Sequence, residues 1–217
     1  MATRRLRPTT EFETPLWVQG ATYVAGLDEA GRGAWAGPVT AAAVILNPAA
    51  LPAGLDDSKR LTPAQRNRLY IEIEATAYGV GVGVVNADVI DQINIVEATR
   101  RAMAQAVAAL PQRPDFLLLD ALHLPAVAIP QRALVHGDAR SISIAAASII
   151  AKVYRDRLMD ALDAEYPAYG FARHKGYGTA YHQRALERYG PCPAHRLTFR
   201  GVAPAPLLKP LKVKLNY

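Results

Sequence analysis

Two adjacent carboxylates, Asp28 and Glu29, lie between a short apolar run and a glycine-rich turn at residues 31–33. Neighbouring side chains on a strand point to opposite faces, so these two acids can meet at one site only where the strand ends. We predict that end at residues 30–31, because glycine adopts backbone conformations that other residues avoid. The pattern indicates a strand tip with two acids beside a loop whose backbone can approach a ligand. A surface turn closed by a Glu29–Arg32 pair is the competing interpretation.

Two further acids follow other predicted elements. Asp120 comes directly after the apolar residues 116–119, where a carboxylate is costly unless it is paired, solvated or bound to a cation. Asp138 precedes a long helical stretch, where a helix N-cap is the competing interpretation. Four carboxylates in one place repel one another, and divalent cations relieve that repulsion. Oxygen ligands without histidine or cysteine favour Mg²⁺ or Mn²⁺, and two such ions about 4 Å apart can hydrolyse a phosphodiester.

The spacing of apolar residues predicts the elements that must position these acids. After the first strand, the expected strands are residues 39–46, 79–85, 116–119 and one between residues 126 and 135. The expected helices are residues 63–76, 95–110, 141–165 and 179–189, the first of them opened by a capping box at Thr62 and Gln65.

This order of elements predicts an α/β fold with a mixed five-stranded sheet flanked by helices and a helical C-terminal region. The helix at residues 95–110 can carry the chain across the sheet, so that the strand at residues 116–119 lies parallel to the first strand. Ligands bind at the carboxyl ends of strands at such a switch point. We expect a lead-in at residues 1–20 that is irregular, one domain at residues 21–200, and a basic tail at residues 201–217.

The formal net charge of the 217-residue chain is +6, and it is unevenly distributed. Residues 21–139 carry a net charge of −3 and residues 140–200 a net charge of +5. This division suggests a metal centre beside a polyanion-binding surface, and uneven surface charge without a ligand is the competing interpretation. The single cysteine excludes an intrachain disulfide, and the sequence shows neither a secretory signal nor an apolar run that could span a bilayer. A cytoplasmic protein is expected.

With these motifs in place, the sequence resembles the bacterial ribonuclease HII family, the type 2 ribonucleases H. The matching segments follow one another in family order over roughly residues 22–200: 27–33 with 37–39, 57–59, 119–121, 137–138, 144–153 with 155–156, 174–179, and 195–196. One departure is Thr198, where serine is commoner in the family, and the hydroxyl is kept.

The resemblance implies an RNase H-like fold and an endonuclease that acts on RNA–DNA hybrids and on single ribonucleotides embedded in duplex DNA. It implies cleavage 5′ to the ribonucleotide by a two-ion Mg²⁺ or Mn²⁺ site, with 3′-hydroxyl and 5′-phosphate products. It identifies as catalytic residues and metal ligands the four carboxylates Asp28, Glu29, Asp120 and Asp138. We also expect a monomer that does not bind membranes.

The resemblance further implies the residues that hold the substrate. RNA differs from DNA by its 2′-hydroxyl, which the backbone of Gly31, Arg32 and Gly33 would read, with Arg32 beside the phosphates. Tyr177 would pack on the nucleotide beyond the cleavage site. The competing interpretations are a turn needed only for folding and a loop tyrosine that caps the core. Three residues resemble phosphate contacts and could equally be surface or solvated groups: Ser58, Lys59 and Lys152.

Two other functions compete with this one. A metal-dependent 3′–5′ exonuclease also uses four carboxylates, but its first motif usually separates two acids by one residue, whereas Asp28 and Glu29 are adjacent. A binding module without catalysis would not need all four carboxylates. A labelled-end assay separates internal from terminal cutting, and chelation of metal separates catalysis from binding.

Overall fold

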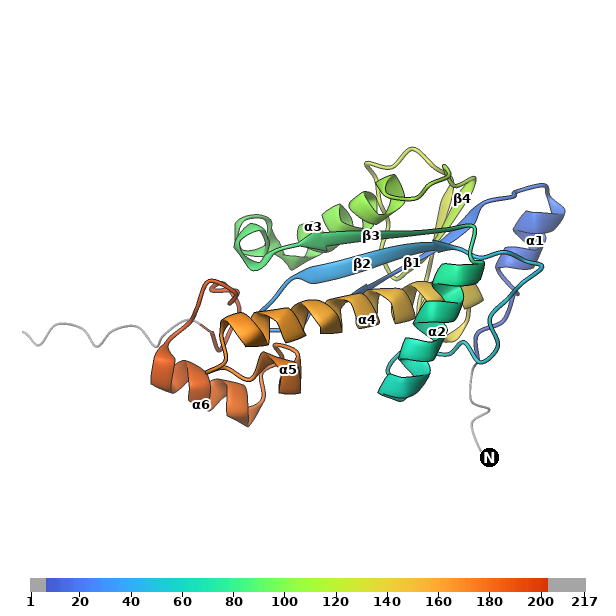
Figure 1. Cartoon of the computed structure of the whole chain (residues 1–217). Coiled ribbons are helices and arrows are strands. Elements are labelled where there is room, and N and C mark those ends of the chain that lie inside the picture. Colours follow the sequence, from blue (N-terminus) through green and yellow to red (C-terminus); the bar gives the residue numbers. More distant parts are fainter. Residues whose placement is uncertain (1–6, 203–217) are drawn as a thin grey trace, which may run out of the picture.

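A five-stranded mixed sheet forms the centre of the computed structural model, which describes residues 7–202 (Figure 1). The strands are β1 (Val24–Ala30), β2 (Val39–Ile45), β3 (Gly79–Val85), β4 (Phe116–Asp120) and β5 (Gln131–Leu134). Their order is β3-β2-β1-β4-β5, with β1 antiparallel to β2 and parallel to β4. The predicted α/β class, the mixed sheet and the switch point between β1 and β4 are therefore confirmed.

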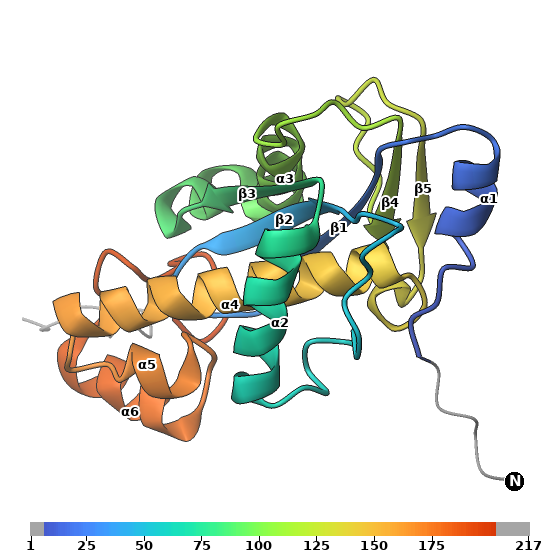
Figure 2. The ribbon, with the colours of Figure 1, turned by 45° about the vertical axis from the view of Figure 1, so that its right-hand side comes forward.

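The helices cover both faces of this sheet (Figures 1 and 2). They are α1 (Glu13–Val18), α2 (Pro63–Thr76), α3 (Ala87–Ala108), α4 (Ile142–Glu165), α5 (Phe171–His174) and α6 (Ala180–Tyr189), with a short 3₁₀ turn η1 (Gly137–Ala139) before α4. One apolar core lies between α3 and the sheet, and a second lies between the sheet and α4 with α2. Within residues 7–202, no helix is both long and apolar enough to cross a membrane.

Glycines in the strands allow the two long helices to lie directly on the sheet. A Cβ atom on Gly26 would stand 2.1 Å from the carbonyl carbon of Ser143 in α4, and one on Gly83 would stand 2.0 Å from the carbonyl oxygen of Ala102 in α3. Such distances leave no room for any side chain, so both positions require glycine. The close approach of α4 to β1 brings the segment before α4 to the carboxyl ends of β1 and β4.

The first strand ends where the sequence predicted. Pairing with β2 continues through Asp28, Glu29 and Ala30, so the strand end predicted at residues 30–31 is confirmed. The two carboxylates lie within regular strand and therefore leave it on opposite faces. The turn begins only at Gly31, whose φ of 91° is in the left-handed region.

The segment before β1 also differs from the expectation of an irregular lead-in. Residues 13–18 form α1, and the fully buried carboxylate of Glu13 accepts hydrogen bonds from the Ser141 hydroxyl and the Ser143 backbone N–H. The lead-in is thus tied to the first turn of α4. The basic tail predicted at residues 201–217 lies, from residue 203 on, outside the described residues.

The remaining helix predictions hold with two changes. The capping box at Thr62 and Gln65 is present, and α2, α4 and α6 lie within one residue of their predicted limits. Helix α3 begins earlier than predicted and is kinked at Asn94, which has a φ of 67°. The C-terminal region gains α5, and it packs with α6 around Phe171 and Met159 in a third apolar cluster at the end of α4 (Figure 2).

Candidate active site

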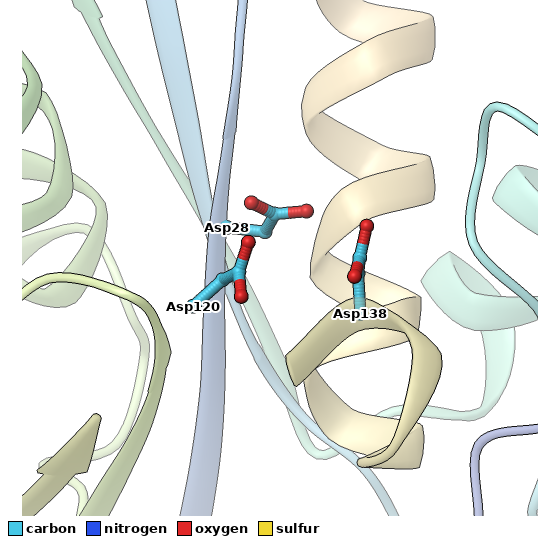
Figure 3. Close-up of side chains that lie close together, drawn as sticks. All are labelled: Asp28, Asp120 and Asp138. Atoms are coloured by element: carbon cyan, nitrogen blue, oxygen red, sulfur yellow. The ribbon is translucent and has the colours of Figure 1, made fainter. Parts of the chain in front are cut away.

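Three carboxylates from separate elements meet beside the N-terminal end of α4 (Figure 3). We call Asp28, Asp120 and Asp138 the acidic cluster. Each offers one oxygen, and these oxygens all lie within 4.8 Å of one another. Asp28 comes from β1, Asp120 ends the parallel neighbour β4, and Asp138 lies in η1. Three acids far apart in sequence are therefore gathered by the strand pairing and by the packing of α4 on the sheet.

Asp120 and Asp138 are held in place by one backbone contact and one turn. The backbone N–H of Gly137 donates to Asp120 Oδ1 at 2.7 Å, which ties the end of β4 to η1. The N-cap of α4 is Ser141, whose hydroxyl accepts from the Ile144 N–H at 3.2 Å. The interpretation of Asp138 as that N-cap is therefore wrong, and its carboxylate is left for the acidic cluster.

Glu29 stands beside this group and is not one of its three members. Its Oε1 accepts from Arg32 Nη1 at 3.2 Å, so the Glu29–Arg32 pair considered for the turn is present. Its second oxygen, Oε2, is buried and has no hydrogen-bond partner among the described residues. A buried carboxylate oxygen without a donor is costly, and a cation would satisfy it.

The acids oppose one another's ionisation. Burial, followed by the charges of Glu29 and Asp120, raises the pKa of Asp28 well above its usual value. Burial also raises the pKa of Glu29, against the influence of Arg32, and burial raises the pKa of Asp138, with help from Asp57. Lys59 Nζ, 3.6 Å from Asp138 Oδ2, offsets part of this charge. An all-oxygen set with excess negative charge and an unpaired buried oxygen fits a hard divalent cation.

Two buried arginines hold the turn that follows Glu29. Arg155 of α4 donates to the carbonyl oxygens of Pro38 at 2.9 Å, Ala36 at 3.1 Å and Lys175 at 2.9 Å. Arg196 donates to the carbonyl oxygen of Arg32 at 2.9 Å and to that of Gly37 at 3.0 Å. Neither guanidinium has a carboxylate partner among the described salt bridges, so both serve the backbone of this loop.

The two glycines of the turn have different surroundings. A Cβ on Gly31 would lie 1.9 Å from Arg155 Nε, and its φ is positive, so the fold itself requires glycine there. Gly33 is exposed, and a Cβ on it would meet nothing within 4 Å. Packing within the protein therefore explains Gly31 and leaves Gly33 without a structural reason.

Tyr177 lies next to this turn, although the two are far apart in sequence. The residue is 41% exposed, and its ring centroid lies 5.7 Å from the guanidinium carbon of Arg155. The preceding Gly176 accepts hydrogen bonds from the backbone N–H groups of Trp35 at 2.8 Å and Ala36 at 3.2 Å. An exposed ring is thus presented beside the turn, which is not the arrangement of a tyrosine that caps the core.

The three residues that resemble phosphate contacts have different environments. Lys59 is exposed beside Asp138. Ser58 is buried, and its hydroxyl accepts from Ser148 of α4 at 2.7 Å. Lys152 donates to Asp156 at 2.7 Å and lines a cavity of about 510 Å³ between α2 and α4. Only Lys59 of the three is both exposed and in ion-pair distance of the acidic cluster.

The sequence interpretation did not single out Arg155 and Arg196 for a role of their own. A signal for Arg155 was available, because it lies four residues from Ala151 and four from Met159 on a buried face of α4. A charge on an apolar helix face must find polar partners. No comparable periodicity marks Arg196, which follows irregular backbone.

Comparisons with known proteins agree on one family. A family model described as Ribonuclease HII matches residues 25–202. The chain is 57% identical over 203 residues to Ribonuclease HII of Chloroflexus aurantiacus, covering 91% of this chain and 96% of that protein. It is 55% identical over 204 residues to Ribonuclease HII of Geobacillus thermodenitrificans, covering 94% and 78%. The crystal structure of ribonuclease H2 from Pyrococcus horikoshii OT3 matches with a TM-score of 0.69 at 28% identity, covering 82% and 94%.

Proposed function

The chain belongs to the ribonuclease HII family and cleaves the RNA strand of RNA–DNA hybrids, and we propose that its acidic cluster and Glu29 hold two divalent cations for that reaction. The observation that carries this proposal is the meeting of three carboxylates from β1, β4 and η1 within 4.8 Å. The unpaired Oε2 of Glu29 supports a fourth ligand. Because every donor is a carboxylate oxygen, the ions are Mg²⁺ or Mn²⁺.

The residues around the acidic cluster bind and orient the substrate strand. When bound, the two ions supply an activated water and stabilise charge on the leaving 3′ oxygen. Lys59 lies beside Asp138 and is placed to meet a phosphate, and Arg32 binds a second phosphate on the other side of Glu29. The products are a 3′-hydroxyl and a 5′-phosphate. The same residues act on a hybrid and on a single ribonucleotide embedded in duplex DNA.

Recognition of the ribonucleotide is proposed for the turn at residues 31–33 together with Tyr177. The exposed backbone at Gly33 can approach a 2′-hydroxyl, and the Tyr177 ring packs on the next sugar, best where that sugar has no 2′-hydroxyl. The pair therefore reads an RNA-to-DNA step, and cleavage falls 5′ to the ribonucleotide. A site built to bond a hydroxyl rejects its absence strongly, by factors of about 10⁴ in favourable cases, so all-DNA duplex is essentially inert.

End-labelled product mapping tests this assignment. A DNA duplex with one ribonucleotide is incubated with and without Mg²⁺, using wild type and Tyr177→Ala. We expect one internal cut 5′ to the ribonucleotide that disappears in chelator and slows in Tyr177→Ala under single turnover, since positioning is lost. Cutting 3′ to the ribonucleotide, progressive cutting from an end, or cleavage in excess chelator would each refute part of the proposal.

Gly33→Ala separates substrate recognition from folding. A methyl group at this position meets nothing in the protein, so we expect an unchanged melting temperature and slower cleavage of a single embedded ribonucleotide. The matched Gly31→Ala protein is expected to lose stability as well, because of its positive φ and the contact with Arg155. Wild-type cleavage by Gly33→Ala would show that the substrate does not approach this backbone.

We also propose that residues 21–200 act as one catalytic domain and that the chain works as a monomer in the cytoplasm. Support for one domain comes from the single sheet that carries the acidic cluster and from the contacts of α4 with β1, β2 and α5. Sedimentation at micromolar concentration tests the monomer, and a stable dimer would contradict it.

A further inference from the structure

Beneath the loop that carries Tyr177 lies a buried chain of two histidines, which we call the histidine relay. It consists of His182, near the start of α6, and His195, which directly precedes Arg196. Both side chains are buried, and their Nε2 atoms are 2.9 Å apart. The ring of Trp35, from the loop after the glycine turn, packs on His182 with centroids 5.6 Å apart. The relay therefore touches both loops proposed to recognise the ribonucleotide.

The hydrogen bonds of the histidine relay fix which nitrogens carry protons. The backbone N–H of Cys192 donates to His195 Nδ1 at 3.0 Å, which is shorter than the 3.3 Å from Nδ1 to the Cys192 carbonyl oxygen, so we assign the lone pair to Nδ1 and the proton to Nε2. At the other end, the carbonyl oxygen of Tyr177 can only accept, so His182 Nδ1 carries a proton and donates to it at 3.0 Å. His182 Nε2 then accepts from His195 Nε2. Both ends impose the same direction on the central bond.

The carbonyl held by His182 also accepts from the Thr179 backbone N–H at 2.8 Å, and the Tyr177 N–H donates to the His174 carbonyl at 3.0 Å. These two bonds stay within the loop, so His182 is the donor that ties the Tyr177 carbonyl to the buried histidines. Tyr177 is 41% exposed, so the position of its ring depends on its backbone. That backbone follows two residues in the left-handed region, Lys175 with a φ of 50° and Gly176 with a φ of 81°. Turns of this kind have alternatives close in free energy, and a fixed donor from the protein interior selects one of them.

We propose that His182 and His195 are positioning residues of the cleavage reaction, which fix the Tyr177 carbonyl and thereby the ring that packs beside the scissile phosphate. His182 acts directly on Tyr177, and His195 acts by holding the tautomer and orientation of His182. The inference rests on the proposed role of Tyr177 in binding the nucleotide. It does not involve the acidic cluster, so metal binding is expected to be unaffected.

Asparagine and glutamine provide a crossed test of the relay. An asparagine amide occupies the place of Nδ1 and a glutamine amide that of Nε2. His182→Asn therefore keeps the donor to the Tyr177 carbonyl, and His182→Gln loses it. For His195 the order reverses, because His195→Gln keeps the contact with His182 and His195→Asn keeps only the contact with Cys192. We expect His182→Gln and His195→Asn, which break the chain of hydrogen bonds to the Tyr177 carbonyl, to cleave about tenfold more slowly than wild type. We expect His182→Asn and His195→Gln to cleave at rates near wild type.

The measurement is single-turnover cleavage of a duplex with one ribonucleotide at saturating Mg²⁺, with melting temperature and Mn²⁺ affinity as parallel readouts. A merely structural role would make activity follow melting temperature, without the crossed order. The expected result is the crossed order in rate, with metal affinity unchanged in all four proteins. Equal rates for Asn and Gln at both positions, or rates that simply follow stability, would overturn the proposal.

A double-mutant cycle links the effect to Tyr177. If His182 acts through the ring, His182→Gln is expected to slow wild type about tenfold and to slow Tyr177→Ala hardly at all. Full additivity of the two losses would overturn the relay. If Tyr177→Ala alone cleaves as fast as wild type, the proposed role of Tyr177 fails. If Tyr177→Ala is slow and His182→Gln is fast, only the relay fails.

Discussion

Asp28 is the residue where folding and function conflict most directly. It is buried, it lies beside three other carboxylates, and its pKa is raised chiefly by burial. At neutral pH without a cation, its ionised form therefore destabilises the fold. In the proposed two-cation site a bound divalent cation would reverse the sign of that interaction, so we expect Asp28 to stabilise only the metal-bound protein.

Asp28→Asn is expected to abolish cleavage and to raise the melting temperature measured in chelator. The amide keeps the shape and removes a buried like charge, which is worth on the order of 1 kcal/mol per unit of pKa shift. The further stabilisation that Mg²⁺ gives wild type is expected to shrink in the variant. Asp88→Asn, on an exposed carboxylate in the first turn of α3, serves as control and is expected to leave cleavage unchanged and not to raise the melting temperature. An active Asp28→Asn enzyme would contradict the metal site.

His182 gives a second prediction at this scale, on the dependence of stability on pH. Burial above all, together with the neighbours His174 and His195, lowers its pKa from 6.5 to about 4. As pH falls below 6.5, the unfolded chain takes up a proton that the folded chain refuses, so stability is lost between about pH 6.5 and pH 4. Two other titratable groups lie near these histidines. Cys192 contacts His195, and the charge of Glu165 acts on Cys192.

The stability difference between wild type and His182→Asn, followed by urea unfolding from pH 7.5 to 4.5, isolates this contribution. We expect wild type to lose stability relative to the variant as the solution is acidified. The raised pKa values of Asp28, Glu29 and Asp138 act in the opposite direction, and they cancel in the comparison because both proteins contain them. A difference that does not change with pH would show that His182 titrates normally in the fold.

At the scale of elements, helix α3 contains a break that its side chains explain. Asn94, with a φ of 67°, interrupts the helix, and its Oδ1 accepts from the backbone N–H groups of Val96 at 2.9 Å and Glu97 at 3.2 Å. It thus caps the longer, C-terminal part of α3, the part that packs on β3 and that the spacing of apolar residues predicted. The shorter part before the break escaped prediction because its own apolar spacing is brief.

Asn94→Ala is expected to lower the free energy of unfolding by about 1–2 kcal/mol. The substitution removes the capping hydrogen bonds, and alanine tolerates a positive φ less well than asparagine does. Asn86 provides the matched control, because it is the N-cap of α3 but makes no side-chain capping hydrogen bond. Asn86→Ala is expected to cost clearly less. Urea unfolding measures both, and equal losses would contradict the capping role of Asn94.

How far sequence predicts an element depends on whether the signal is local. The limits of α2 and β3 could be predicted because a capping box and alternating valines are local patterns. The regular pairing of Asp28 and Glu29 could not, because it depends on residues 41 and 42 of β2. The acids still converge, because α4 brings Asp138 to the β1 face that carries Asp28.

The same distinction applies to the site. Carboxylates at strand ends could be predicted as a group, since parallel strands place their carboxyl ends together. The contacts of Arg196 with Arg32 and of His182 with His195 join residues whose proximity only the folded chain creates. The spacing of residues in the sequence does not predict such contacts. For this reason the sequence did not predict α5 or the histidine relay.

At the scale of the whole molecule, the charges are divided along the chain. The acidic cluster belongs to the β1 and β4 ends, and the excess of basic residues belongs to residues 140–200, which form α4 to α6. We expect a duplex bound at the acidic cluster to contact this basic region as well. Phosphate contacts release counterions, and affinity then falls steeply as salt increases.

The salt dependence of duplex binding should distinguish Lys59 from Lys152, which the sequence analysis placed in the same class of phosphate contacts. The Lys59 side chain is 80% exposed and only 3.6 Å from Asp138, whereas Lys152 is 24% exposed and is held by Asp156 at 2.7 Å. A phosphate can take Lys59 without breaking a close ion pair, so Lys59→Ala is expected to reduce the slope of log affinity against log salt by about 1. Lys152→Ala is expected to reduce it by less, because its charge is already balanced.

The measurement is the dissociation constant of a hybrid duplex at several salt concentrations, in an Asp120→Asn background that we expect not to cleave. Arg100→Ala is the control, because Arg100 pairs with Glu97 on α3, on the face of the sheet opposite α4. Its slope is expected to equal that of the parent. If Lys152→Ala flattens the slope as much as Lys59→Ala, the ion pair with Asp156 opens on binding, and the cavity between α2 and α4 becomes part of the path of the duplex. A slope unchanged by both substitutions would place the phosphates on other cations of α4 to α6.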